Sequence, residues 1–299
     1  MKFRFLFLVV LTCLIILACQ QNKTEKQTFT SGETKILVDE SFTPIIEDQE
    51  YVFENTYTDA KLELINKPEN EVLKLFLNDS IRIAVLSRTL TPEEAKFYEN
   101  KKIKIRINRF AIDGIALITH KTNADSTTTV AEIIKIMQGK PGTIKSLVFD
   151  NPNSSTVRYF KELAGVKDLP NVGIYALKSN PDVIKYVYEH PGSIGVVGIN
   201  WIEQPDENSE KFVADLRVLG IKNLPGKAGS DDFYKPDQNT LALGVYPLTR
   251  SLYVINCTGG TGLGTGFASF LAGEQGQRIV LKSGLLPDSI PSREVIIRK

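Results

Sequence analysis

Histidine is scarce in this chain, and its scarcity narrows the chemistry that the protein can perform. The sequence contains two histidines, His120 and His190, and neither stands at a metal-ligand spacing. It also lacks a Gly-x-Ser-x-Gly sequence, the nucleophile elbow that an α/β-type Ser-His-Asp hydrolase would need. We therefore expect no metal, no cofactor and no enzymatic activity.

The chain also lacks an excess of charge of one sign. It has 36 Lys and Arg against 35 Asp and Glu, a formal net charge of +1, and no basic block. Proteins that bind nucleic acids carry a clustered positive patch. We therefore expect no nucleic-acid partner, and any site for an anion has to be built locally.

Long apolar runs are missing except at the N-terminus. Lys2 and Arg4 precede an apolar stretch at 5–17, and Ala18-Cys19 follows it directly. This stretch is shorter than the ~20 residues that a membrane-spanning helix needs. A positive start, a short apolar segment and a small residue before cysteine resemble a bacterial lipoprotein signal, and an uncleaved N-terminal anchor is the alternative.

The signal interpretation predicts how the N-terminal segment is used. Residues 1–19 form the lipoprotein signal, cleavage precedes Cys19, and Cys19 carries the lipid. The polar residues 20–31 form a flexible tether. Because Cys257 is then the one cysteine left in the globular part, we expect a buried thiol and no disulfide within the chain. The protein is expected to be lipid-anchored on the periplasmic or cell-envelope side of a bacterial membrane.

Apolar, β-branched runs alternate with helical segments through the rest of the chain. The predicted strands lie at 35–38, 62–65, 82–86, 147–149, 172–177 and 194–198. The predicted helices lie at 42–57, 70–77, 91–100, 130–138 and 180–189, with one long last helix from 266 through 279. The sequence Thr91-Pro92-Glu93-Glu94 has the cap, the proline and the first-turn acids of a helix start. The alternation predicts an α/β protein with mainly parallel sheets.

Two extended runs, 103–119 and 241–255, are each too long for an ordinary strand. A chain that leaves one sheet, builds another and returns has to cross twice. We therefore predict two α/β lobes joined by two crossing strands, with a cleft between the lobes. Lobe one comprises 32–119 and 242–299, and lobe two comprises 120–241.

Hydroxyl side chains gather where predicted helices begin. After an Asn-Pro-Asn turn, Ser154, Ser155 and Thr156 stand at a helix start, where free N–H groups and the helix dipole favour an anion. The hydroxyls add further donors, although plain N-capping is the alternative. Two other loops, 39–42 and 87–89, also follow strands, so three loops are predicted to converge on one ligand.

A set of short sequences also occurs in a characteristic order. The set comprises Ser87-Arg88, Asp113-Gly114-Ile115, Val130–Gly139, Ser154-Ser155-Thr156, Tyr246–Arg250 with Leu252-Tyr253, Phe267–Phe270, Glu274–Gln277 and Gly284–Pro287. In this order, residues 33–290 resemble the phosphate-binding lipoproteins of phosphate ABC transporters, within the type II periplasmic binding protein superfamily. The resemblance implies the two-lobed type II fold, capture of phosphate or a similar oxyanion, an ABC permease as partner, and a monomer. The alternative is a solute-binding sensor or accessory lipoprotein of the same fold with a different ligand.

The resemblance also implies which residues hold the ligand. Its first loop corresponds to Ser41 and Phe42, its second to Ser87, and its buried carboxylate to Asp113. Its hydroxyl-rich helix start corresponds to the segment Asn153, Ser154, Ser155 and Thr156. For Asp113-Gly114 a bend between strand segments is the alternative, and for Ser87-Arg88 a loop with a surface salt bridge.

This chain departs from the family just before that helix start. Where the family has an Arg and an Asp, the sequence has Asp150 and Pro152. We expect Arg88 to supply the missing charge from the other lobe by bidentate pairing, with Arg158 and Arg250 as the next candidates.

The carboxylate of Asp113 suggests a basis for selectivity. An ionised carboxylate only accepts hydrogen bonds, and phosphate near neutral pH still carries a proton to donate. Sulfate carries none and would leave the carboxylate unpaired, so Asp113 is expected to favour phosphate.

Overall fold

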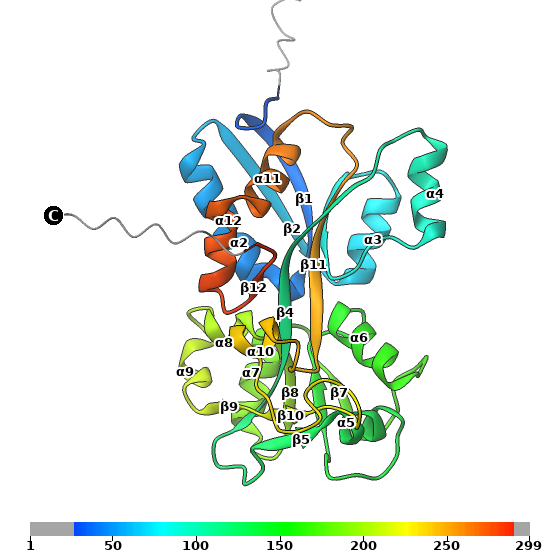
Figure 1. The fold of residues 1–299 in the computed structure, drawn as a ribbon, viewed down its shortest axis with the longest axis vertical. Coiled ribbons are helices and arrows are strands. Elements are labelled where there is room, and N and C mark those ends of the chain that lie inside the picture. Colours follow the sequence, from blue (N-terminus) through cyan, green and yellow to red (C-terminus); the bar gives the residue numbers. More distant parts are fainter. Residues whose placement is uncertain (1–26, 290–299) are drawn as a thin grey trace, which may run out of the picture.

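Two α/β lobes joined by two long strands make up the protein in the computed structural model, which describes residues 27–289 (Figure 1). The predicted signal, the lipidation site Cys19 and most of the predicted tether lie outside the described residues.

The first lobe is built on a parallel sheet. Its strands are β2 (Ala60–Lys67), β1 (Gly32–Asp39) and β3 (Ile83–Leu86), which pair in that order. The connecting helices are α2 (Thr43–Thr56) and α3 (Glu69–Leu77), and α4 (Pro92–Asn100), α11 (Leu263–Ala272) and α12 (Glu274–Lys282) complete the lobe. Crossover helices cover a parallel sheet, which is why β3 is buried along its whole length.

The second lobe repeats this plan. Its parallel strands are β8 (Ile194–Gly198), β6 (Leu147–Phe149) and β7 (Ile174–Ala176). Its helices are α5 (Val130–Met137), α6 (Ser155–Ala164), α7 (Asn180–Glu189), α8 (Asn200–Glu203), α9 (Glu210–Val213) and α10 (Gln238–Ala242). The short strand β9 (Leu216–Val218) pairs with the main sheet, while β5 (Thr127–Thr129) and β10 (Gly220–Lys222) form a separate pair.

Two antiparallel strands connect the lobes. The strand β4 (Arg106–His120) pairs through its first part with β11 (Thr249–Asn256) and β12 (Leu286–Pro287), and from Ile115 on with β8. Because β4 belongs to both lobes, it joins their strands into one continuous ten-stranded sheet. The returning chain crosses beside it, where the Ile115 amide donates to the Leu248 carbonyl at 2.8 Å.

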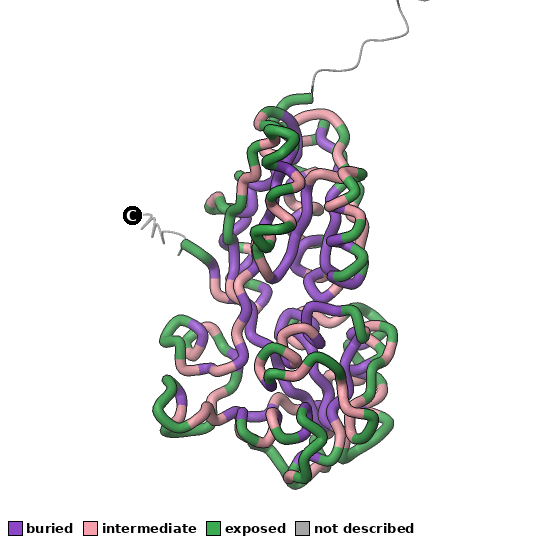
Figure 2. The backbone as a smooth tube through the Cα atoms, turned by 90° about the vertical axis from the view of Figure 1, so that its right-hand side faces the viewer, coloured by how far each residue is buried: buried purple, intermediate pink, exposed green. Residues whose placement is uncertain are grey.

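The two-lobed α/β fold is therefore confirmed, while the exact lobe boundaries stay a prediction. Figure 2 shows that buried backbone follows the central strands through both lobes and across the junction. The junction between the lobes is thus a buried part of the molecule, and the candidate site lies there.

Two predicted elements differ in the structure. The extended run 241–255 is a strand only from Thr249. Its first two residues end the short helix α10, which begins at an Asp237–Thr240 capping box, and Gly244 follows with a φ of +67°. The predicted long last helix is two helices, α11 and α12, divided at Gly273, whose ψ of 170° is extended. A side chain at Gly276 would meet the Phe270 carbonyl oxygen at 2.3 Å, so the second helix packs directly on the end of the first.

Candidate functional site

The first strand delivers a short loop to the junction. The strand β1 ends at Asp39, and its Oδ1 accepts a hydrogen bond from the Ser41 amide at 3.1 Å. This cap begins the single turn η1 (Glu40–Phe42), and it leaves Ser41 and Phe42 fully buried. The Ser41 hydroxyl thereby faces the second lobe.

The start of α6 delivers the matching hydroxyls. Ser154 caps the helix, because its Oγ accepts from the Val157 amide at 3.2 Å and donates to Asp150 Oδ1 at 2.6 Å. For Ser154 the capping alternative is thus what the structure shows. The next two hydroxyls are not used in capping, and both meet the Ser41 hydroxyl across the junction, Ser155 at 3.4 Å and Thr156 at 3.5 Å.

A buried arginine organises this group. The Arg250 Nε donates to Asp113 Oδ2 at 2.9 Å, and its Nη1 donates to the hydroxyls of Ser155 at 3.0 Å and Thr156 at 3.2 Å. The guanidinium carbon lies 4.4 Å from the centre of the Phe42 ring, a cation–π contact. Arg250 and Asp113 face each other directly across β11 and β4. One side chain therefore connects the crossing strands, the first loop and the α6 start.

Arg250 was named only after Arg88 as a possible source of the positive charge, although its place in the sequence already indicated an inward-facing side chain. Alternate residues of a strand share one face, and Arg250, Leu252 and Val254 all stand on the buried face of β11. A charged residue in such an inward-facing series needs a partner, which is Asp113.

Buried carboxylates outnumber cations around Arg250 at the junction between the lobes. Asp39, Asp113 and Asp150 are all fully buried, while Arg250 is the cation that contacts the hydroxyl group. Burial raises the pKa of Asp39 to about 7, with a further increase from Glu69 and an opposing effect of Arg250. Burial likewise raises the pKa values of Asp113 and Asp150, against the effects of their hydrogen-bond donors.

Several buried polar atoms at the junction have no hydrogen-bond partner in the described part of the chain. They include Asp39 Oδ2, Asp113 Oδ1, Arg250 Nη2 and Asn200 Oδ1. Unpaired buried polar groups cost free energy, and native proteins usually satisfy them. Acceptors and a charged donor in one place suit a small polar ligand that supplies the complementary groups.

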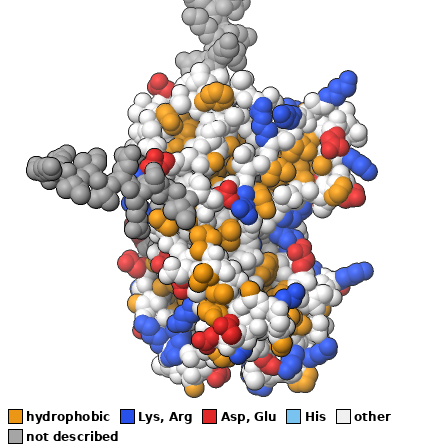
Figure 3. Space-filling model, viewed as in Figure 1, with side chains coloured by type: hydrophobic (Ala, Val, Ile, Leu, Met, Phe, Trp, Pro, Cys, Tyr) orange, Lys and Arg blue, Asp and Glu red, His pale blue; other side chains and the backbone are white. Residues whose placement is uncertain are grey.

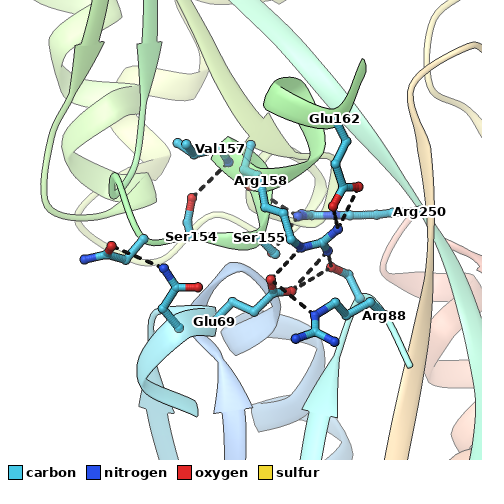
Figure 4. A network of polar contacts seen from close by, with 12 residues as sticks. Glu69, Arg88, Ser154, Ser155, Val157, Arg158, Glu162 and Arg250 are labelled. Atoms are coloured by element: carbon cyan, nitrogen blue, oxygen red, sulfur yellow. Dashed lines mark hydrogen bonds and ion pairs between the residues drawn. The ribbon is translucent and has the colours of Figure 1, made fainter. Parts of the chain in front are cut away.

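Ser87 and Arg88 contact a network around Glu69. Figure 4 shows the Arg88 and Arg158 side chains pointing toward Glu69. Arg88 forms two hydrogen bonds to Glu94, at 2.7 and 2.8 Å, and its Nε lies 3.9 Å from Glu69. The Ser87 hydroxyl accepts from Arg158 at 3.0 Å and donates to Glu69 at 3.4 Å. Within residues 27–289, no hydrogen bond or ion pair joins Ser87 or Arg88 to the Arg250 group. The salt-bridge alternative therefore describes what Arg88 does in the structure.

Further polar contacts hold the lobes together. Arg158 on α6 reaches Glu69 on α3 at 2.5 Å, and Glu69 is fully buried. Asn153 accepts two hydrogen bonds from Asn70, both at 3.3 Å, and is exposed at the rim. Trp201 donates its indole N–H to the Ser41 carbonyl at 3.0 Å.

Four further features concern the described residues. Among residues 27–289, no group of His, Cys, Asp and Glu could hold a metal ion. No helix in that same range combines the length and apolarity needed to span a bilayer. Cys257 is buried, and burial raises the pKa of its thiol to about 12. On the face shown in Figure 3, Lys and Arg side chains are interspersed with Asp and Glu.

The fold and the buried polar junction define a two-lobed binding protein of the periplasmic type. Residues 23–275 match the PBP superfamily domain, and the chain belongs to this superfamily.

Two curated relatives are similar in sequence over most of the chain. The phosphate-binding protein PstS of Staphylococcus epidermidis is 26% identical over 223 residues, which cover 71% of this chain and 64% of the relative. That of Staphylococcus saprophyticus is 25% identical over 235 residues, 75% of this chain and 70% of the relative. The chain thus spans less than two thirds of the length of the first relative.

Two crystal structures share the fold. One is a Clostridium perfringens protein described as a phosphate ABC transporter substrate-binding protein with bound phosphate, with a TM-score of 0.70, 21% identity, and coverage of 86% of this chain and 100% of that one. The other is an ABC-type phosphate transport receptor of Vibrio cholerae, with a TM-score of 0.63, 17% identity and the same coverages.

Proposed function

We propose that this protein is a substrate-binding protein that captures phosphate, or a similar tetrahedral oxyanion, for an ABC importer. The observation that carries the proposal is the buried Arg250, which donates to the Ser155 and Thr156 hydroxyls opposite Ser41. A guanidinium beside the N-terminus of a ten-residue helix is a strong oxyanion site, because charge and directed donors coincide. The names of the relatives support phosphate as the ligand.

The proposed ligand group differs from the sequence prediction in its cation. It comprises Ser41, Phe42, Asp113, Ser155 and Thr156, with Arg250 in the role first given to Arg88. Asn153 and Ser154 shape the rim and the cap of the same helix start. Ser87 and Arg88 act on the ligand indirectly, through the Glu69 network.

Selectivity for phosphate follows from Asp113. Its Oδ2 is held by Arg250, and its Oδ1 has no hydrogen-bond partner in the described chain. A protonated phosphate oxygen can donate to that atom, whereas sulfate has no proton to donate. The same argument separates binding from catalysis, because a fixed acceptor and fixed donors need no reactive group.

Thermal unfolding of the purified protein tests the ligand. At a hundredfold excess over the dissociation constant, a ligand adds about 2.7 kcal/mol to the stability of the native state. For a domain of this size this raises Tm on the order of 5–10 °C. We expect this shift with phosphate and a much smaller one with sulfate. A clear shift with another solute, and none with phosphate, would reject phosphate as the ligand.

We further propose that Cys19 anchors the protein by lipid at the periplasmic or cell-envelope side of the membrane, where it meets the permease as a monomer. Cys19 follows the short apolar segment and a small residue, as in a lipoprotein signal. The variant Cys19→Ala should leave the precursor uncleaved or release the protein from membranes, whereas Cys257→Ala should do neither. Membrane fractionation of both variants decides, and unchanged processing and retention of Cys19→Ala would contradict the anchor.

A further inference from the structure

Asp39 lies next to the proposed ligand group, and one of its carboxylate oxygens has no hydrogen-bond partner among the described residues. Its Oδ1 caps η1 by accepting from the Ser41 amide, which accounts for one oxygen only. Its Oδ2 has no hydrogen-bond partner among the described residues, although the residue is fully buried. A helix cap needs only one acceptor oxygen, so the second oxygen of Asp39 remains able to accept a hydrogen bond from a ligand.

No described side chain packed around Asp39 donates a hydrogen bond to its Oδ2. Arg250 from β11 lowers the pKa of Asp39 by its charge, but its Nε is held by Asp113, its Nη1 by two hydroxyls, and its Nη2 makes no hydrogen bond to Asp39 Oδ2. Glu69 from α3 and Glu40 from η1 both add negative charge next to Asp39. The Ser155 hydroxyl from α6 lowers the pKa of Asp39, but it donates its proton to Ser41 at 3.4 Å. The charge of Glu69 is itself balanced by Arg158 and Arg88.

Asp150 differs from Asp39 in this respect. Its Oδ1 accepts from Ser154 at 2.6 Å, and its Oδ2 accepts from Asn180 at 3.3 Å. Both of its oxygens therefore have donors within the protein. Asp39 and Asp113 are left as the two carboxylates of this group that each have one free oxygen.

We propose that Asp39 is a second acceptor carboxylate for the ligand, so that the site takes a tetrahedral oxyanion with two protons, dihydrogen phosphate, in preference to the doubly charged form. This inference rests on the proposed function and deepens it. One hydroxyl of the ligand donates to Asp113 Oδ1 and a second to Asp39 Oδ2, while Arg250 and the hydroxyls of Ser41, Ser155 and Thr156 bind the remaining oxygens. A doubly charged ligand would leave one carboxylate unpaired beside added negative charge, which is a repulsive element.

The proton count of the complex follows from this arrangement. Singly charged phosphate with ionised Asp39 has the same number of protons as doubly charged phosphate with protonated Asp39, so the complex shares one proton between the two partners. The pKa of Asp39, raised by burial to about 7, and that of phosphate, about 6–7 by analogy with phosphoserine, are close enough for such sharing. Above these values both free partners have lost that proton, so binding has to take one up.

Calorimetric titration of the purified full chain with inorganic phosphate tests the inference. For the wild-type protein we expect the dissociation constant to rise about tenfold per pH unit between about pH 7.5 and 9, the slope of one proton. Titration at the upper pH in two buffers of different ionisation enthalpy should count close to one proton taken up. If Asp113 were the single acceptor, the complex would hold doubly charged phosphate, and both the slope and the count would be close to zero.

Two substitutions assign the effect to Asp39. Asp39→Asn and Asp39→Ser both remove the charge, and both keep an oxygen that can accept from the Ser41 amide, so the cap survives in either variant. In both we expect the slope above about pH 7.5 to flatten to less than twofold per unit and sulfate binding to improve relative to phosphate. The exposed Asp168 provides a matched control, since Asp168→Asn should keep the wild-type slope.

The outcomes distinguish the role of Asp39 as a second acceptor from the proposed binding of phosphate. Phosphate binding without proton uptake, or Asp39 variants with the wild-type slope, would overturn the second acceptor and leave the proposed function standing. Absence of phosphate binding at every pH would overturn the proposed function itself. Because burial and nearby carboxylates also raise the pKa of Glu40 to about 7, the Asp39 variants are needed to assign the proton, but a wild-type count close to zero would overturn the second acceptor even if both variants fail to fold.

Discussion

Arg250 shows at the scale of one residue how geometry selects among similar side chains. Arg88, Arg158 and Arg250 are chemically identical, and all three lie near the junction between the lobes. Arg88 and Arg158 have carboxylate partners in the Glu69 network. Arg250 has Asp113 on one side and two hydroxyls on the other, and its Nη2 is without a partner in the described chain. Arg88 Nε also makes no hydrogen bond there, but it faces Glu69 at 3.9 Å, so Arg250 is the guanidinium with a donor left beside the hydroxyls of the proposed site.

This difference predicts unequal effects of matched substitutions. Arg250→Gln should weaken phosphate binding by about 2–5 kcal/mol, the usual cost of removing one partner of a desolvated charge pair. Arg88→Gln should cost within about 1 kcal/mol, because its main partner Glu94 lies outside the ligand group. Calorimetric titration measures both, and circular dichroism checks that each variant is folded. Equal losses, or a larger loss for Arg88→Gln, would show that the charge has been assigned to the wrong residue.

At the scale of elements, the contact between α3 and α6 closes the junction. Glu69 begins α3 in one lobe, and Arg158 lies on α6 in the other, with two hydrogen bonds between them at 2.5 and 3.1 Å. Glu69 is fully buried at this contact between the lobes. The same Arg158 also pairs with Glu162, but that carboxylate lies one turn along the same helix. Arg158 therefore has one carboxylate partner in the other lobe and one in its own lobe.

The two carboxylate partners of Arg158, Glu69 and Glu162, provide a matched test of lobe closure. Glu69→Gln should weaken phosphate binding by about 1.5–3 kcal/mol, the contribution of hydrogen bonds to charged groups, because the contact exists in the closed form. Glu162→Gln should change it by less than about 0.5 kcal/mol, as for other pairs within a helix. Titration of the two variants side by side measures the difference. A Glu162→Gln loss as large as that of Glu69→Gln would mean that Arg158 stabilises α6 and plays no part in closure.

At the scale of the whole molecule, the single tryptophan lies at the junction. Trp201 is the one tryptophan of the chain, and its indole N–H donates to the Ser41 carbonyl of the other lobe at 3.0 Å. It is 7% exposed in the structure, in which the lobes are in contact. Separation of the lobes would break this hydrogen bond and expose the ring to water.

Tryptophan fluorescence should therefore report the position of the lobes. We expect phosphate to shift the emission of the wild-type protein to shorter wavelength and to lower its radius of gyration in X-ray scattering, because binding favours the closed form. Trp201→Phe should remove the emission change while retaining the change in radius. If calorimetry showed binding with neither change, the lobes would be a rigid pair.

The sequence by itself determined most of the elements. Hydrophobic periodicity and helix-capping residues are local properties, so the parallel strands of the main sheet and the Thr91–Glu94 capping box lie where the sequence predicted them. The short strands β5, β9, β10 and β12 were not predicted. The crossing strands were also predictable, because residues 103–119 are too long for one lobe. The candidate loops at Ser41 and Ser155 follow from the rule that helix starts gather at the carboxyl ends of strands.

Tertiary structure alone decided which of these residues meet. Arg250 and Asp113 are 137 positions apart, and no local pattern distinguishes their pair from a pair made by Arg88. The break at Gly273 likewise depends on how α12 packs on α11, which helix propensity does not encode. The free oxygen of Asp39 exists because one loop is buried against α6 from the other lobe. Burial and long-range contact set the charge balance of the junction and leave some of its polar atoms without a partner in the described chain, and both arise only when the chain has crossed between its lobes twice.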